Sequence, residues 1–146
     1  MSLPIKICWL AIQFARLSGF SPIVTTASPH NTVLVKSIGA THVIDRNADI
    51  LVEAAKIFAT APKPNVVYDA ISGPTQEVGW SILAPGGTMV LVHPVRPGIN
   101  SGEDGKTAFM VWGGVDRYPE FGRSMFGSMT ELLQSGDFRV SCVSLN

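Results

Sequence analysis

The sequence has little charge and only two cysteines, and each scarcity excludes a class of function. Of its 146 residues 15% are charged and the formal net charge is zero, so no strong field draws the chain to nucleic acid or to an anionic membrane. Neither cysteine has a second Cys or a His at metal-ligand spacing, and we predict no metal site. For Cys8 and Cys142 two interpretations remain open, buried thiols in a reducing compartment or a disulfide.

The sequence also lacks a recognisable signal peptide. Its N-terminal apolar run, residues 7–15, falls well short of the roughly 20 residues that span a bilayer, and no small-residue cleavage site follows it. The apolar residues of this run recur at helical spacing up to Leu17, and Gly19 is a natural end for the helix. We therefore predict an amphipathic helix, no membrane partner and a cytoplasmic location.

A hydrophobic fraction of 46% predicts one globular domain with a generous core. Up to residue 92, segments of helical period alternate with short apolar runs. The predicted helices cover residues 7–18, 31–38, 48–61 and 75–83, and the predicted strands cover residues 22–26, 42–44, 65–69 and 88–92. Helices between short apolar strands imply parallel pairing and right-handed crossovers. The predicted fold class is α/β, a doubly wound parallel sheet with its ligand site beyond the carboxyl ends of the strands.

The pattern changes after residue 92. A loop rich in Gly and Pro covers residues 93–107, and the predicted elements that follow are a strand at 108–112, a helix at 118–134 and a strand at 138–145. We interpret the chain as a single domain, 1–146, with an α/β core at 1–112 and a C-terminal helix and strand at 113–146.

Three stretches of the chain resemble the cofactor-binding domain of the medium-chain dehydrogenase/reductase superfamily. They are AIQFARLSGF (11–20), TTASPHNTVLVKSIGATHVID (25–45) and VVYDAISGPTQEVGWSILAPGGTMVLV (66–92). Within the superfamily the chain looks most like the zinc-independent quinone oxidoreductases and the fungal trans-acting enoyl reductases. The resemblance implies a Rossmann-type domain that takes NADP(H) and no metal.

Members of that superfamily are much longer and carry a separate substrate domain. Their cofactor domain begins with a strand and a Gly-rich turn that cradles the pyrophosphate. When the chain is aligned on residues 11–20, the last glycine of that turn falls at Cys8 and the strand falls ahead of Met1. We therefore expect a truncated domain that lacks the first strand and the Gly-rich turn.

The strand expected to be absent is the central one in the order 3-2-1-4-5-6. Without it the strands at 22–26 and 65–69 flank a gap, and each presents an open edge. We expect the gap to close by direct pairing, or to be filled by the predicted strand 138–145 or by a strand of a second copy. The open edge also predicts a homo-oligomer.

The resemblance places the adenosine ribose of the cofactor at the turn after the strand 22–26. The acid that holds the ribose 2′-hydroxyl in NAD enzymes is absent there. Ser28, His30 and Asn31 occupy the turn, with Lys36 on the next helix, and the resemblance implies that these residues contact the 2′-phosphate of NADP. The alternative is a plain polar turn in which Asn31 caps the helix.

A second set of residues follows the next two strands. The resemblance places six residues along the ribose and nicotinamide: Asp69, Ala70, Ile71, Ser72, Val92 and His93. The alternative is a strand end followed by a Ser72 helix cap, and both interpretations are compatible. His93 has no carboxylate at short spacing, which favours a surface residue over an acid-base group.

The sequence contains no recognisable catalytic set. We interpret the chain as the remnant of an NADP-dependent enoyl or quinone reductase cofactor domain, with weak or no catalysis. The alternative is a non-catalytic binding or signalling protein that acts through self-association or through a protein or cell-surface partner. A third reading is that the chain is a fragment of a longer enzyme.

Overall fold

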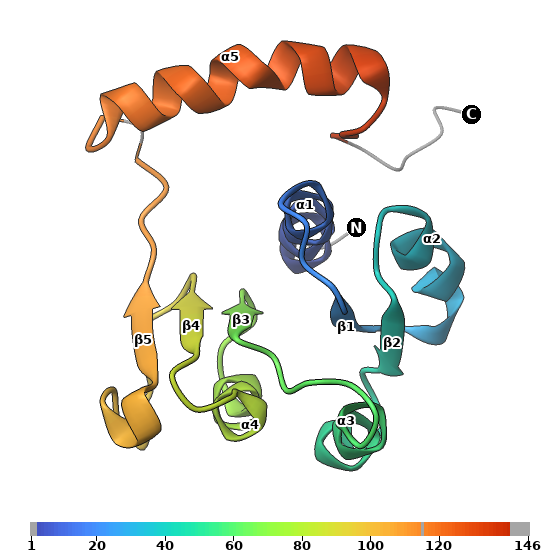
Figure 1. Cartoon of the computed structure of the whole chain (residues 1–146), viewed down its shortest axis with the longest axis vertical. Helices are drawn as coiled ribbons and strands as arrows, with labels where there is room; N and C mark the ends of the chain where they lie inside the picture. Colours follow the sequence, from blue (N-terminus) through green and yellow to red (C-terminus); the bar gives the residue numbers. More distant parts are fainter. Residues whose placement is uncertain (1–2, 115, 141–146) are drawn as a thin grey trace. The chain divides into compact units, whose positions relative to one another are not determined.

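The structure is a computed structural model that describes residues 3–114 and 116–140. The chain divides into two compact units, Met1–Val111 and Trp112–Asn146. The first unit contains every described strand and four α-helices, and the second contains one long helix (Figure 1).

Helices and strands alternate along the first unit in the predicted order. The helices are α1 (Leu3–Leu17), α2 (Thr32–Ser37), α3 (Ile50–Phe58) and α4 (Pro74–Ile82), with 3-10 turns η1 (Pro29–Asn31) and η2 (Glu103–Gly105). The strands are β1 (Val24–Ala27), β2 (His42–Asp45), β3 (Val66–Asp69), β4 (Thr88–Leu91) and β5 (Thr107–Met110). All strand pairs are parallel, and helices lie on both sides of the strands (Figure 1). The predicted α/β fold of Rossmann type is confirmed.

Helix α1 begins four residues earlier than predicted. Its described part starts at Leu3, and Pro4 is compatible with the first turn of a helix, where a backbone N–H has no helical partner. The segment expected to replace the Gly-rich turn is therefore helical. The turn after α2 lies close to α1, since a Cβ on Gly39 would lie 2.8 Å from Cβ of Arg16.

The five described strands form two separate sheets. In one sheet β1 pairs with β2, and Val24 lies opposite His42. In the other the order is β3-β4-β5, and Val66 lies opposite Thr88. Since β1 does not pair with β3, the prediction that the gap closes directly is wrong. A filler from residues 141–146 or from a second copy lies outside the described residues and stays a prediction.

A hydrophobic cluster in the core of the first unit is built around β4. Its buried residues are Trp80, Leu83, Met89, Leu91 and Ile99. Helix α4 contributes Trp80 and approaches the sheet closely, because a Cβ on Gly79 would lie 2.9 Å from side-chain atoms of both Met89 and Val67. The glycine thus allows the helix to sit against β3 and β4.

The second unit is dominated by α5 (Pro119–Ser135), which differs by one residue at each end from the predicted helix. Gly136 follows it with φ 78°, a left-handed conformation that suits glycine. The predicted strand 138–145 is wrong over its described part. The N–H of Phe138 donates to the carbonyl of Leu132 at 3.0 Å, so the chain folds back on the helix end instead of extending, and residues 141–146 lie outside the described part.

Candidate functional site

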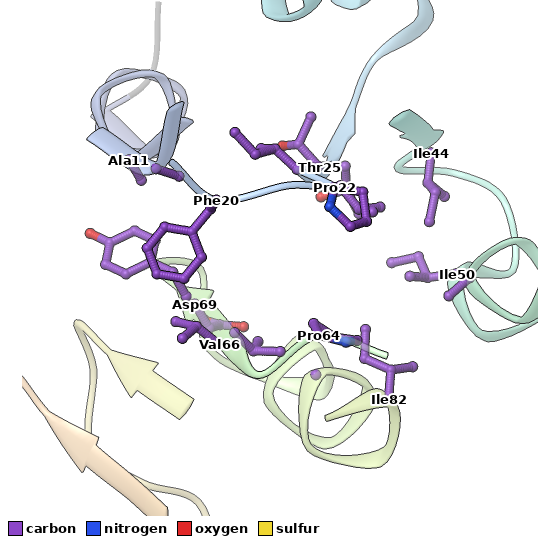
Figure 2. A pocket seen from close by; sticks show the side chains of 18 of the residues that line it. Ala11, Phe20, Pro22, Thr25, Ile44, Ile50, Pro64, Val66, Asp69 and Ile82 are labelled. Atoms are coloured by element: carbon purple, nitrogen blue, oxygen red, sulfur yellow. The ribbon is translucent and has the colours of Figure 1, made fainter. Parts of the chain in front are cut away.

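A cavity of about 390 Å³ lies between the two sheets of the first unit. Residues of β1 and β3 face it from opposite sides, and α1, α3 and α4 contribute the remaining walls (Figure 2). Most of its lining is apolar, and its labelled members include Phe20, Ile44, Ile50, Val66 and Ile82. The cavity lies between the two strand edges that were expected to pair.

The first predicted residue set lies at the carboxyl end of β1. The N–H of Asn31 donates to the carbonyl of Ser28 at 2.8 Å, which closes η1. Asn31 stands at the N-cap of α2, but its side chain makes no capping hydrogen bond. Ser28 is buried, whereas His30 and Lys36 are exposed. His30 thus belongs to the turn itself, whereas Lys36 belongs to the last turn of α2.

The second set lies at the carboxyl end of β3, where Asp69 holds the following turn together. One carboxylate oxygen accepts from the backbone N–H of Ile71 at 2.9 Å and of Ser72 at 2.7 Å. The other accepts from the hydroxyl of Thr75. Asp69 is 7% exposed, so its carboxylate serves the turn from a buried position.

The prediction that Ser72 caps α4 is wrong. Gly73 occupies the N-cap position, and no side chain there makes a capping hydrogen bond. Asp69 already accepts from the amides of the turn, and Ser72 adopts a left-handed backbone with φ 71°. A positive φ is uncommon outside glycine, so the carboxylate bonds determine the shape of this turn.

Within the second set, the structure brings residues 69–72 after β3 beside residues 92–93 after β4. The N–H of Val92 donates to the carbonyl of Asp69 at 3.0 Å, which joins the two strand ends. Ala70 is buried, Val92 is half-buried, and Ile71 and His93 are exposed. These residues therefore gather at one edge of the β3-β4-β5 sheet, while the set around His30 lies on the other sheet.

Gln76 is a functional candidate that the sequence prediction missed. It is fully buried, its Nε2 donates to the carbonyl of Pro94 at 3.1 Å, and its Oε1 accepts from the N–H of Arg96 at 3.0 Å. The helical spacing could have indicated this residue. Gln76 precedes the buried Gly79 by three residues and the buried Trp80 by four, which places it on the inner face of the helix. A polar residue on that face needs buried partners.

Residues 7–104 match the family model described as zinc-binding dehydrogenase. The chain belongs to this family. It is thereby a member of the medium-chain dehydrogenase/reductase superfamily, as its sequence motifs predicted.

Two trans-enoyl reductases show the relationship in sequence. Trans-enoyl reductase ACTTS2 of Alternaria alternata is 35% identical over 91 residues, a match that covers 60% of this chain and 25% of that protein. Trans-enoyl reductase eqxC of Fusarium heterosporum is 62% identical over 37 residues, which cover 25% of this chain and 10% of that protein. The matched region is thus a quarter or less of each of these medium-chain reductases.

Solved structures show the same fold. The quinone oxidoreductase of Pseudomonas syringae pv. Tomato DC3000 superposes with a TM-score of 0.71 at 23% identity, covering 90% of this chain and 43% of that one. CurK enoyl reductase superposes with a TM-score of 0.71 at 22% identity, covering 90% of this chain and 41% of that one. At these identities the likeness shows the Rossmann-type fold alone.

Among the described residues of this dehydrogenase-family chain, the side chains offer no set that fits a zinc ion. Within residues 3–114 and 116–140, no three His, Cys, Asp or Glu side chains are grouped so that they could hold a metal. The side chain of Cys8 and the whole of Cys142 lie outside the described part, so neither interpretation of the cysteines is tested. Across the same residues, no helix combines the length and the apolar character that a membrane span requires.

Proposed function

We propose that this chain is the cofactor-binding part of an NADP(H)-dependent enoyl or quinone reductase. The observation that carries the proposal is the position of the two residue sets. The chain belongs to a family of dehydrogenases, and the residues predicted to contact the cofactor follow the carboxyl ends of β1, β3 and β4. Ligands of open α/β sheets bind at such strand ends. NADPH, when bound, supplies a hydride to a conjugated alkene or a quinone.

The β1 turn would take the adenosine ribose and its 2′-phosphate. Residues 27–31 contain no acid, and the exposed His30 and Lys36 bring donors that attract a phosphate. A ribose 2′-hydroxyl without phosphate would gain little from these two side chains. The turn therefore favours NADP(H) over NAD(H).

The β3 and β4 turns would take the nicotinamide end. The buried Asp69 fixes the backbone of Ile71 and Ser72, and the half-buried Val92 and exposed His93 form the adjoining wall. These residues would orient the nicotinamide ring and limit the access of water to it. No described side chain is assigned a proton-transfer role, and turnover by this chain alone is expected to be weak or absent.

The pyrophosphate would be held less well by these residues than by a Gly-rich turn. Its usual cradle is a Gly-rich turn at a helix N-terminus, and the described chain has the helix α1 from Leu3 onward in that region. Binding then depends on the two ends of the dinucleotide. We expect a micromolar rather than a nanomolar dissociation constant.

The test is a titration of NADPH and NADH into the wild-type chain and into the double variant His30→Gln, Lys36→Gln, followed by nicotinamide fluorescence. Wild type should prefer NADPH, and the variant should lose about tenfold in NADPH affinity, as expected for two phosphate contacts, with NADH unchanged. Lys56→Gln, an exposed lysine of α3, is the matched control and should behave as wild type. Equal losses in the control and in the double variant would contradict the role of the turn.

We also propose a second function, self-association through the outer strands of the β3-β4-β5 sheet. Val66 on β3 is 42% exposed and Phe109 on β5 is 48% exposed, which is unusual for strands of a doubly wound sheet. Val66→Lys should lower the mass measured by size exclusion with light scattering, because an edge lysine opposes strand pairing. Val33→Lys, at an exposed valine of α2, should leave the mass unchanged. A wild-type chain of monomer mass at high concentration would rule this function out.

A further inference from the structure

Gln76 joins two turns that belong to different strand ends. It lies in the first turn of α4, directly after the turn that Asp69 holds. Its amide group pairs with the backbone on both sides of Val95, by donating to Pro94 and accepting from Arg96. This segment follows His93, so a side chain of α4 holds the path of the chain after β4.

Only a primary amide of this length can make both bonds. The turn 94–96 presents one acceptor and one donor, so its partner must carry a donor and an acceptor at the same end. A glutamate lacks the donor, and a methionine of similar shape lacks both. Since Gln76 is 0% exposed, water does not replace the lost partners without a rearrangement of the turn.

Two further contacts place the 94–96 turn over the start of α4. The guanidinium of Arg96 lies 3.4 Å from the carboxylate of Glu77. A Cβ on Gly73 would lie 3.8 Å from Nη1 of the same arginine. Gln76 Nε2 also lies 3.5 Å from the hydroxyl of Ser72, which completes the link to the β3 turn.

We propose that Gln76 is a positioning residue for the nicotinamide end of the cofactor site. It holds the 94–96 turn, and with it His93, against the 69–73 turn. This inference rests on the proposed function, because the two turns are the ones assigned to the nicotinamide and its ribose. The adenosine end, on the β1-β2 sheet, does not depend on Gln76.

The test compares Gln76→Met with Gln13→Met. Gln13 is a matched control because it is 2% exposed and donates its Nε2 to the carbonyl of Trp9 within α1. For each variant we would measure amide hydrogen exchange at Arg96 by NMR, the NADPH affinity, and the affinity for adenosine 2′,5′-bisphosphate. The last ligand probes the adenosine end alone.

Gln76→Met should speed exchange of the Arg96 amide and weaken NADPH about tenfold, in line with the loss of a buried hydrogen-bond pair. Adenosine 2′,5′-bisphosphate should bind as to wild type, and Gln13→Met should change neither the Arg96 exchange nor the ratio of the two affinities. If Gln76→Met does not fold, Gln76→Asn keeps the amide one methylene shorter and should give the same pattern at smaller size.

If the Arg96 amide of Gln76→Met exchanges as slowly as in wild type, Gln76 does not hold residues 94–96 and the proposal is overturned. Equal weakening of both ligands would overturn the positioning role, because it would mark a general loss of structure. If the wild-type chain binds adenosine 2′,5′-bisphosphate but gains nothing from the nicotinamide half, the positioning role is overturned while the adenosine part of the proposed function survives. If wild type binds neither ligand, the proposed function fails and Gln76 is left a structural residue, as the exchange data would show.

Discussion

The β3-β4-β5 sheet and the β1-β2 sheet differ in how the turns at their carboxyl ends are held. After β3, the carboxylate of Asp69 accepts three hydrogen bonds and Gln76 ties in the neighbouring turn. After β1, η1 is closed by a backbone bond, and neither η1 nor α2 has a side-chain cap bond. The turn proposed for the nicotinamide end is thus held by buried polar side chains, whereas the turn proposed for the adenosine end has the exposed His30.

The two sheets also differ in burial. On β4, Met89 and Leu91 are fully buried beneath α4, but no residue of β1 is. The cavity lies beside β1, where no described strand covers this edge. Strand β1 is therefore less well covered than β4.

The largest expected effect is at the turn after β3. Asp69→Ala leaves the amides of Ile71 and Ser72 without their acceptor in a buried turn and should lower the free energy of unfolding by about 3 kcal/mol. Asn31→Ala, at the cap position after β1, should cost less than about 0.5 kcal/mol since its side chain makes no capping bond.

Chemical denaturation followed by tryptophan fluorescence measures both variants. Asp49→Ala is a useful third member, because its exposed carboxylate caps α3 by accepting from Leu51 and Val52, and its loss should cost about 1 kcal/mol. Similar losses for Asp69→Ala and Asn31→Ala would remove the contrast between the two turns.

A smaller effect is expected where α4 meets β3 and β4. Gly79→Val should lower the free energy of unfolding by about 2 kcal/mol, because the first added carbon would lie 2.9 Å from side-chain atoms of Met89 and Val67. Gly127→Val, on α5 with no atom within 4 Å of the new Cβ, is the control and should be close to neutral. If Gly79→Val left the free energy of unfolding unchanged, the close approach of α4 to β3 and β4 would not contribute to stability.

The order of elements up to residue 92 could be predicted from the sequence because it rests on local period. Alternating helices and short apolar strands, with Gly and Pro at the turns, determined the fold class and placed most ends within two or three residues. The family motifs added the two residue sets, and the structure locates each set at a strand end. Whether these residues bind a cofactor stays a prediction.

What could not be predicted depends on non-local packing. The gap between β1 and β3 holds a cavity whose lining comes from distant parts of the chain, among them α1, α3 and α4. The helix cap at Ser72 was wrong because α4 begins one residue later, with Gly73 at the N-cap position. Gln76 was missed because its partners at 94 and 96 lie about twenty residues away, in a segment that reads only as a loop.

The most direct test of the central claim is a calorimetric titration of NADPH into the 146-residue chain, with NADH and adenosine 2′,5′-bisphosphate as comparisons. The account predicts micromolar binding of NADPH, weaker binding of NADH, and binding of the bisphosphate that is lost in the His30→Gln, Lys36→Gln variant. Absence of binding by all three ligands up to millimolar concentration would contradict it. The Rossmann-type fold would then be present without a cofactor site, and self-association would become the leading function.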